Sequence, residues 1–171
     1  MPEPPAAGVL AFRRSEERVQ VLLCCSRPGG RGSWQVPEWR AELIVAGPAA
    51  SIEERLRRRP VRKVGQQQLL EVARLGFVEA CDAPLEGPFW FLGGVKRQRH
   101  RILYVWAAET DCPSDSFRAT PWVLARWFDL DTGRGLIAAS QRRFLDELEV
   151  LLNVGRAGSE RAAGADRCAA R

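Results

Sequence analysis

The chain of 171 residues has the length of a single domain, and 46% of its residues are hydrophobic, which is enough for an ordinary core. Charged residues make up 27%, and no stretch approaches the roughly 20 apolar residues of a transmembrane helix. The first five residues contain one acid and three prolines, and they lack the basic and apolar regions of a signal peptide. We therefore expect no transmembrane helix and no signal peptide, and a cytoplasmic location.

The net charge of +5 comes mostly from arginine. Such an excess favours anionic partners such as phosphates or nucleic acid, but a composition rich in arginine and alanine also explains it. A nucleic-acid partner would rest on this charge alone, so we do not expect one.

The five cysteines show an odd count and no C-x-x-C spacing, which argues against a disulfide framework and against a zinc site. Cys24 and Cys25 lie in an apolar run, where we expect small buried side chains in a reducing compartment. The others are Cys81, Cys112 and Cys168.

The first part of the chain predicts a β-hairpin. Residues 8–14 form a short apolar run, residues 15–18 a polar turn, and residues 19–25 alternate between apolar and other positions. Residues 27–32 carry the glycines and proline of a loop, and residues 33–37 read as a short extended piece.

The middle of the chain is harder to interpret. Residues 38–65 are poorly patterned, although Ser51 and Glu54 form a capping box that predicts a short helix up to Arg59. Residues 66–80 carry apolar side chains at helical spacing, although Gly76 weakens a helix by about 1 kcal/mol relative to alanine.

Further along, strands are expected at residues 88–95, 101–107 and 122–130, and Ser140 begins an amphipathic last helix. We therefore expect an α/β sandwich. The expected organisation is a tail at residues 1–6, one domain at residues 7–154 and a disordered tail at residues 155–171, which lack apolar periodicity.

Three blocks resemble the Nudix hydrolases, in particular bacterial proteins close to the diadenosine polyphosphate hydrolases. Residues 7–37 resemble the opening hairpin of that family and its W-x-[IVL]-P segment, with Trp34 and Pro37 in place. Residues 86–111 resemble the strand pair after the catalytic helix, and residues 125–148 resemble the closing W-F-[DS]-L segment and final helix. The resemblance implies an α/β/α sandwich with a mixed, curved sheet.

The family is defined by the motif G-x5-E-x7-R-E-U-x-E-E-x-G-U, in which U is a bulky aliphatic residue. Its helix places three carboxylates on one face, because residues three and four positions apart are neighbours there. These carboxylates hold Mg²⁺ or Mn²⁺, which neutralise the pyrophosphate and activate the attacking water.

The motif is degenerate in this chain. Counting back from the second block aligns residues 75–82 with R-E-U-x-E-E-x-G, so that only Phe77 and Glu79 match. Leu75, Gly76 and Ala80 stand where the arginine, the first glutamate and the last glutamate belong. The resemblance implies a pyrophosphohydrolase of nucleoside diphosphates linked to another group, weak or inactive because one carboxylate replaces three.

Glu79 is the candidate catalytic residue and metal ligand. Glu53 and Glu54 are further candidate ligands for Mg²⁺ or Mn²⁺. Adjacent residues diverge by about 100° on a helix, however, and this acidic pair better fits the first turn of a helix. If the protein is inactive, we expect no cofactor.

Candidate contacts for a nucleotide or dinucleoside polyphosphate come from aromatic and basic side chains. Trp34 and Tyr104 are candidates for stacking on a base, although most such aromatics are core residues. Lys96, Arg97 and Arg99 would face phosphates, or would form a solvated hairpin tip.

Three hypotheses remain open. The protein is an enzyme with a substitute set of metal ligands, or a non-catalytic module that binds a nucleotide or a protein. Alternatively, the reading frame is corrupted between about residues 38 and 75, because the family-like blocks on either side enclose a long, arginine-rich segment. In that case this segment would be loosely ordered.

Overall fold

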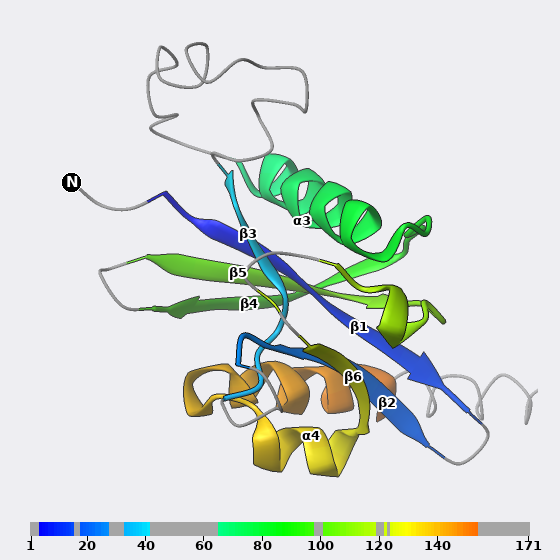
Figure 1. Ribbon diagram of the computed structural model, residues 1–171. Helices are drawn as coiled ribbons and strands as arrows, with labels where there is room; N and C mark the ends of the chain where they lie inside the picture. The colour runs from blue at the N-terminus through cyan, green and yellow to red at the C-terminus, as the bar shows by residue number, and fades with distance from the viewer. Residues whose placement is uncertain are drawn as a thin grey trace, which may run out of the picture.

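A computed structural model describes residues 4–15, 18–27, 33–41, 65–97, 101–118, 122 and 124–153 (Figure 1). Several predictions concern residues outside these ranges, namely the helix from Ser51 with Glu53 and Glu54, the contact from Arg99, and the tail 155–171. In the described part of the chain, no helix is long and apolar enough to cross a membrane.

The centre of the molecule is a mixed sheet. Its strands are β1 (Ala6–Arg14), β2 (Val19–Cys25), β3 (Glu38–Arg40), β4 (Phe89–Lys96), β5 (Ile102–Glu109) and β6 (Leu124–Asp129). They are arranged in the order β4-β5-β1-β2-β6, and β3 pairs with the start of β1. The pair β1 and β5 is parallel and the other pairs are antiparallel. This arrangement confirms the expected α/β class with a mixed sheet.

Strand β1 is buried on both faces, as expected of a central strand covered on both sides. Its side chains alternate, so that Leu10 and Phe12 enter one apolar cluster while Ala7, Val9 and Ala11 enter the other. The small alanines leave room for a helix to approach the sheet closely, and each buried Leu or Phe side chain contributes about 1.5–3 kcal/mol.

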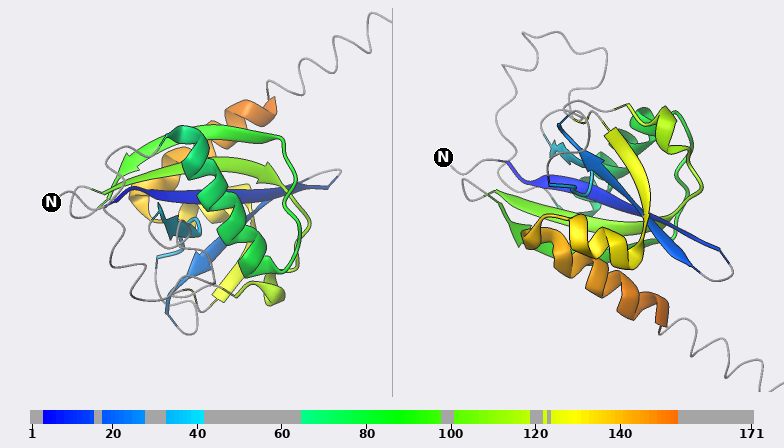
Figure 2. Two further views of the ribbon diagram at one scale, coloured as in Figure 1. Left: turned by 90° about the horizontal axis from the view of Figure 1, so that it is seen from above. Right: turned by 60° about the horizontal axis from the view of Figure 1, so that its bottom comes forward.

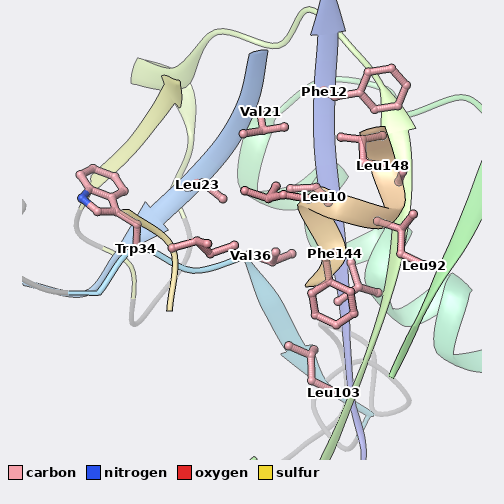
Figure 3. Packing of buried hydrophobic residues seen from close by; sticks show 14 of the residues in the cluster. Leu10, Phe12, Val21, Leu23, Trp34, Val36, Leu92, Leu103, Phe144 and Leu148 are labelled. Carbon is pink, nitrogen blue, oxygen red and sulfur yellow. The ribbon is translucent and has the colours of Figure 1, made fainter. Parts of the chain in front are cut away.

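Helices cover the two faces separately (Figures 1 and 2). On one face α3 (Gln66–Cys81) packs Leu69, Val72 and Phe77 against the strands. On the other face lie α4 (Leu130–Leu136) and a last helix at residues 142–153. Phe144 and Leu148 of the last helix meet the side chains of β1, β2 and β4 (Figure 3).

The sequence predicted the hairpin of β1 and β2, helix α3, and strands β4, β5 and β6 with small shifts of their ends. It missed β3 and α4, because β3 is three residues long and α4 contains Gly133 and Gly135. Gly133 lies so close to β2 that an added Cβ would stand 3.0 Å from Cγ2 of Val21. Ser140 does not cap the last helix, since it lies in the 3₁₀ turn Ala139–Gln141 that precedes it.

Candidate functional site

Helix α3 lies where the resemblance places the catalytic helix, between β3 and β4 in the chain. At its start the backbone N–H of Gly65 donates to Oε1 of Gln68 at 3.1 Å. At its end Asp82 has φ 49°, a left-handed conformation that favours glycine. The alignment puts the last glycine of the motif on this residue.

The position aligned with the first glutamate of the motif is covered by an indole ring. Trp39 of β3 packs over Gly76, and its ring meets Phe77 edge-on at 6.3 Å between centroids. A Cβ on Gly76 would stand 2.7 Å from Cδ1 of Trp39 and closer still to Cγ and Cδ2. Any side chain at position 76 therefore requires Trp39 to move.

The remaining positions of the motif do not assemble a metal site in the described residues. Ala80 is buried, and Glu79 is exposed on the helix surface. Glu71 forms an ion pair with Arg74 at 3.0 Å, and eight residues separate Glu71 from Glu79, about 12 Å along a helix. No group of three or more His, Cys, Asp or Glu residues in the described ranges could hold a metal ion. These residues do not fit Mg²⁺ or Mn²⁺, which need several oxygen ligands.

The structure separates the predicted substrate contacts. Trp34 is 5% exposed and packs edge-on against Phe128 at 4.7 Å, in the cluster beneath the last helix (Figure 3). Lys96 and Tyr104 share the α3 face of the β4–β5 hairpin, because Lys96 pairs with Ile102, two residues from Tyr104. Arg97 points elsewhere, as its Nη2 donates to Oε1 of Gln35 at 2.8 Å.

Arg97 belongs to an ion cluster that the sequence did not predict. Its Nη2 lies 3.4 Å from Oε2 of Glu38, and Nη2 of Arg101 donates to Oε1 of Glu38 at 3.0 Å. The three side chains are only 12–18% exposed. The cluster ties β3 to the end of the β4–β5 hairpin, and it engages Arg97 within the fold. The sequence left open whether this basic run faces phosphates or forms a solvated tip, and nothing in it indicated Glu38 as a partner of the arginines.

An aromatic surface lies on the α3 face of the hairpin and consists of Phe91 and Tyr104, with the buried Trp106 packed against Phe91. Phe91 is 46% exposed, stacks with Tyr104 at 6.4 Å and an interplanar angle of 26°, and lies 5.2 Å from Trp106. Lys96 lies on the same face at the end of β4. Of this surface the sequence singled out Tyr104 as a stacking candidate. Phe91 was missed because β4 was expected to be a buried strand.

A hollow on the other side of the sheet has a different character. It is lined by Arg18, Asp129, Asp131 and Glu149 together with apolar residues of α4 and the last helix. Two of its three carboxylates, Asp131 and Glu149, form ion pairs with Arg134. An anionic ligand is poorly matched to this acidic lining.

Comparison with known proteins gives similarity at the level of structure. No protein-family model and no curated protein sequence matches the chain. The Nudix domain of Shewanella oneidensis NrtR, solved with ADP ribose, superposes with a TM-score of 0.58 at 12% identity over 88% of each chain. The Ap4A hydrolase of C. elegans gives a TM-score of 0.58 at 14% identity, over 86% of this chain and 98% of that one.

A mutT/nudix family protein from Listeria innocua gives a TM-score of 0.56 at 10% identity, over 91% of this chain and 97% of that one. The mixed sheet between α3 and the last helix makes the chain an α/β sandwich protein. More specifically, the chain has the Nudix fold. At these identities the likeness concerns the fold alone.

Proposed function

We propose that this protein is a Nudix-fold module that binds a nucleotide containing a nucleoside diphosphate and does not hydrolyse it efficiently. The contact between Trp39 and Gly76 carries the proposal, because it fills the position aligned with the first metal-binding glutamate. Ala80 is buried without a ligand atom in its side chain, and Glu79 alone cannot neutralise a pyrophosphate through a metal.

The aromatic surface supports the binding half of the proposal. An exposed phenyl ring backed by a stacked tyrosine offers a flat face to a nucleobase, and such stacking contributes about 1–3 kcal/mol per base. Lys96 stands on the same face as a partner for a phosphate, and the net charge of +5 favours anions. The same fold binds ADP ribose in NrtR, and Ap4A hydrolase shares it.

Calorimetry on the full chain with ADP ribose and with diadenosine tetraphosphate tests the proposal. We expect binding of at least one of the two in EDTA, with little change when Mg²⁺ is added. In a parallel assay at high protein concentration, we expect no hydrolysis stimulated by Mg²⁺ or Mn²⁺. A lack of binding by both ligands would overturn the nucleotide-binding half.

The hydrolysis assay also decides the competing hypothesis of an enzyme with substitute metal ligands. That hypothesis needs Glu79 together with Glu53, Glu54 or Glu71. Glu53 and Glu54 lie outside the described residues, and Glu71 forms an ion pair with Arg74. Metal-dependent turnover that is lost in Glu79→Gln, and reduced in Glu53→Gln or Glu54→Gln, would overturn the proposal of an inactive module. A location in the cytoplasm remains a prediction.

A further inference from the structure

Two buried thiols meet at the end of helix α3. Cys81 is the last residue of α3, and Cys112 lies in the segment that leaves β5. Their Sγ atoms are 3.4 Å apart, and the side chains are 2% and 4% exposed. Neither thiol takes part in the proposed nucleotide site, so the proximity of the two sulfurs calls for a separate explanation.

We propose that Cys81 and Cys112 are a redox modification site that closes to a disulfide when the protein reacts with a peroxide. A disulfide bond is about 2.05 Å long, so the sulfurs must approach by a little over 1 Å. Both residues stand at places where the backbone can adjust. Cys81 is followed by the turn at Asp82, and Cys112 lies in irregular chain between the exposed residues Asp111 and Pro113. This exposed segment is also the route by which a small oxidant reaches Cys112.

The surroundings give the two sulfurs different roles. The hydrogen bond with Cys81 lowers the pKa of Cys112, and the nearby positive charge of Arg13 lowers it further, against burial and the charge of Asp111. The same hydrogen bond, together with burial, raises the pKa of Cys81. Cys112 is therefore the thiolate that reacts first, because the thiolate is the nucleophilic form of cysteine.

The reaction balances with hydrogen peroxide as the oxidant. The Cys112 thiolate attacks one peroxide oxygen, the O–O bond breaks, and the departing hydroxide takes up a proton to become water. Cys112 is then a sulfenic acid. The sulfur of Cys81 loses its proton and attacks the sulfur of Cys112, the S–S bond forms, and the S–OH bond breaks to release a second water. Two thiols have lost two electrons and two protons, and one peroxide has become two waters.

The other described cysteines differ from this pair. Cys25 faces the apolar cluster beneath the last helix, on the opposite side of the sheet, and its thiol donates to the carbonyl of Arg27 at 3.7 Å. Cys24 is buried near the pair, and burial raises its pKa well above the ordinary value, which suppresses its reactivity. Cys25 therefore provides a matched control, and Cys24 the competitor to be tested.

Closure of this disulfide would fix the end of α3 to the exit of β5. The two segments already meet there, because the backbone N–H of Arg118 donates to the carbonyl of Ala80 at 2.6 Å and Phe77 packs edge-on against Phe117. The bond would enclose β4 and β5, so it would stabilise the fold chiefly by restricting the unfolded chain. Oxidation should therefore raise the melting temperature of the protein.

The test is peptide mapping of the full chain, in a Cys168→Ser background, after treatment of the native protein with hydrogen peroxide and alkylation of the remaining thiols. We expect one crosslink, between the peptides of Cys81 and Cys112, that a thiol reductant reverses and that raises Tm by roughly 5–10 °C. Cys25→Ser and Cys24→Ser should leave the crosslink in place. Cys81→Ser should instead accumulate a trappable sulfenic acid at Cys112.

Peptide mapping of the folded protein in which Cys81 and Cys112 are both present decides the proposal, even if a variant of either cysteine fails to fold. The proposal would be overturned if Cys81 and Cys112 stayed unlinked although a small thiol added to the same sample had been oxidised completely. A crosslink that appears only after the protein is unfolded in urea, or one that joins Cys24 to either partner in preference to the pair, would overturn it as well.

Discussion

The indole ring of Trp39 lies over Gly76, and this contact joins the short strand β3 to the helix aligned with the degenerate motif. The position that the alignment gives to the first glutamate is therefore filled by packing between two elements, and a side chain at position 76 would require Trp39 to move. Ala80 adds to this arrangement, since it is 3% exposed and a glutamate there would have to leave the packed face of α3.

The first prediction concerns the sign of a stability change. In an ordinary helix, Gly→Ala stabilises by about 1 kcal/mol because glycine loses more backbone freedom on folding. Gly76→Ala should instead destabilise this protein by roughly 1–3 kcal/mol, since the new Cβ overlaps the indole of Trp39. Urea unfolding of the two proteins measures the difference.

A double-mutant cycle shows whether Trp39 is the cause. With Trp39→Ala already present, Gly76→Ala should cost much less or become stabilising, which gives a coupling free energy between the two sites. An equal cost in both backgrounds would contradict the contact as the reason for glycine at position 76.

The second prediction concerns the aromatic surface. Phe91→Ala should weaken nucleotide binding about 5- to 150-fold, the range that corresponds to the stacking energy of one base. Leu136→Ala is the control, because Leu136 is similarly exposed at 40% but lies on α4 at the opposite face. Calorimetric titration of both variants with the same nucleotide makes the comparison. Equal losses in the two variants would argue against a base on this surface.

Features that depend on local sequence could be predicted, whereas features that depend on packing between distant segments of the chain could not. Alternation in β1 and β2 and the helical spacing in α3 are local, and both were predicted. The partner of Trp39 was not predictable, because Trp39 and Gly76 are far apart in sequence and the range between them is poorly patterned. The idea of a corrupted segment from residue 38 is not supported at its described ends, where Trp39 and Leu69 pack against α3 and the sheet.

Among the candidate site residues, too, some were predictable from local sequence and others depend on packing between distant segments. Tyr104 was a stacking candidate because it is aromatic, and it lies on the face that α3 covers. The ion cluster of Glu38, Arg97 and Arg101 depends on how β3 meets a hairpin more than 50 residues away, so local sequence does not indicate the acidic partner of the two arginines. Phe91 is exposed because β4 is the edge strand, and strand order is a property of the whole sheet.

The third prediction concerns acid stability. Arg14 donates to both oxygens of Glu109, at 2.8 and 2.6 Å, where β1 and β5 end side by side. This hydrogen bonding lowers the pKa of Glu109, so the pair stabilises the fold above the unfolded-state pKa near 4.5, and the effect disappears as the pH falls through the lower folded value. Because both side chains are substantially exposed, Glu109→Gln should cost only about 0.5–1 kcal/mol at pH 7.

Unfolding curves of Glu109→Gln and the parent should therefore converge as the pH is lowered below about 4. Glu147→Gln serves as the control, since Glu147 is an exposed carboxylate on the last helix. A stability difference for Glu109→Gln that persists unchanged into acid would show that the charge of Glu109 is not what stabilises the pair.

The last prediction concerns Gln141, a fully buried polar residue just before the last helix. Its Oε1 accepts a hydrogen bond from the backbone N–H of Val36 at 2.8 Å, which holds the Trp34–Pro37 segment against that helix. Gln141→Leu should destabilise the protein by roughly 1–3 kcal/mol, because the buried N–H of Val36 then lacks an acceptor. Thermal and urea unfolding measure this loss.

Gln141→Glu keeps a hydrogen-bond acceptor at this position but adds a group that can become charged. The carboxyl group keeps an oxygen for Val36, but burial in this apolar cluster should raise its pKa above the unfolded value. Stability relative to the parent should then be nearly preserved below about pH 4 and should fall as the pH rises toward 7, because the folded state binds the proton more tightly. A variant equally stable relative to the parent at both pH values would mean that this side chain reaches water, and that Val36 does not depend on a buried acceptor.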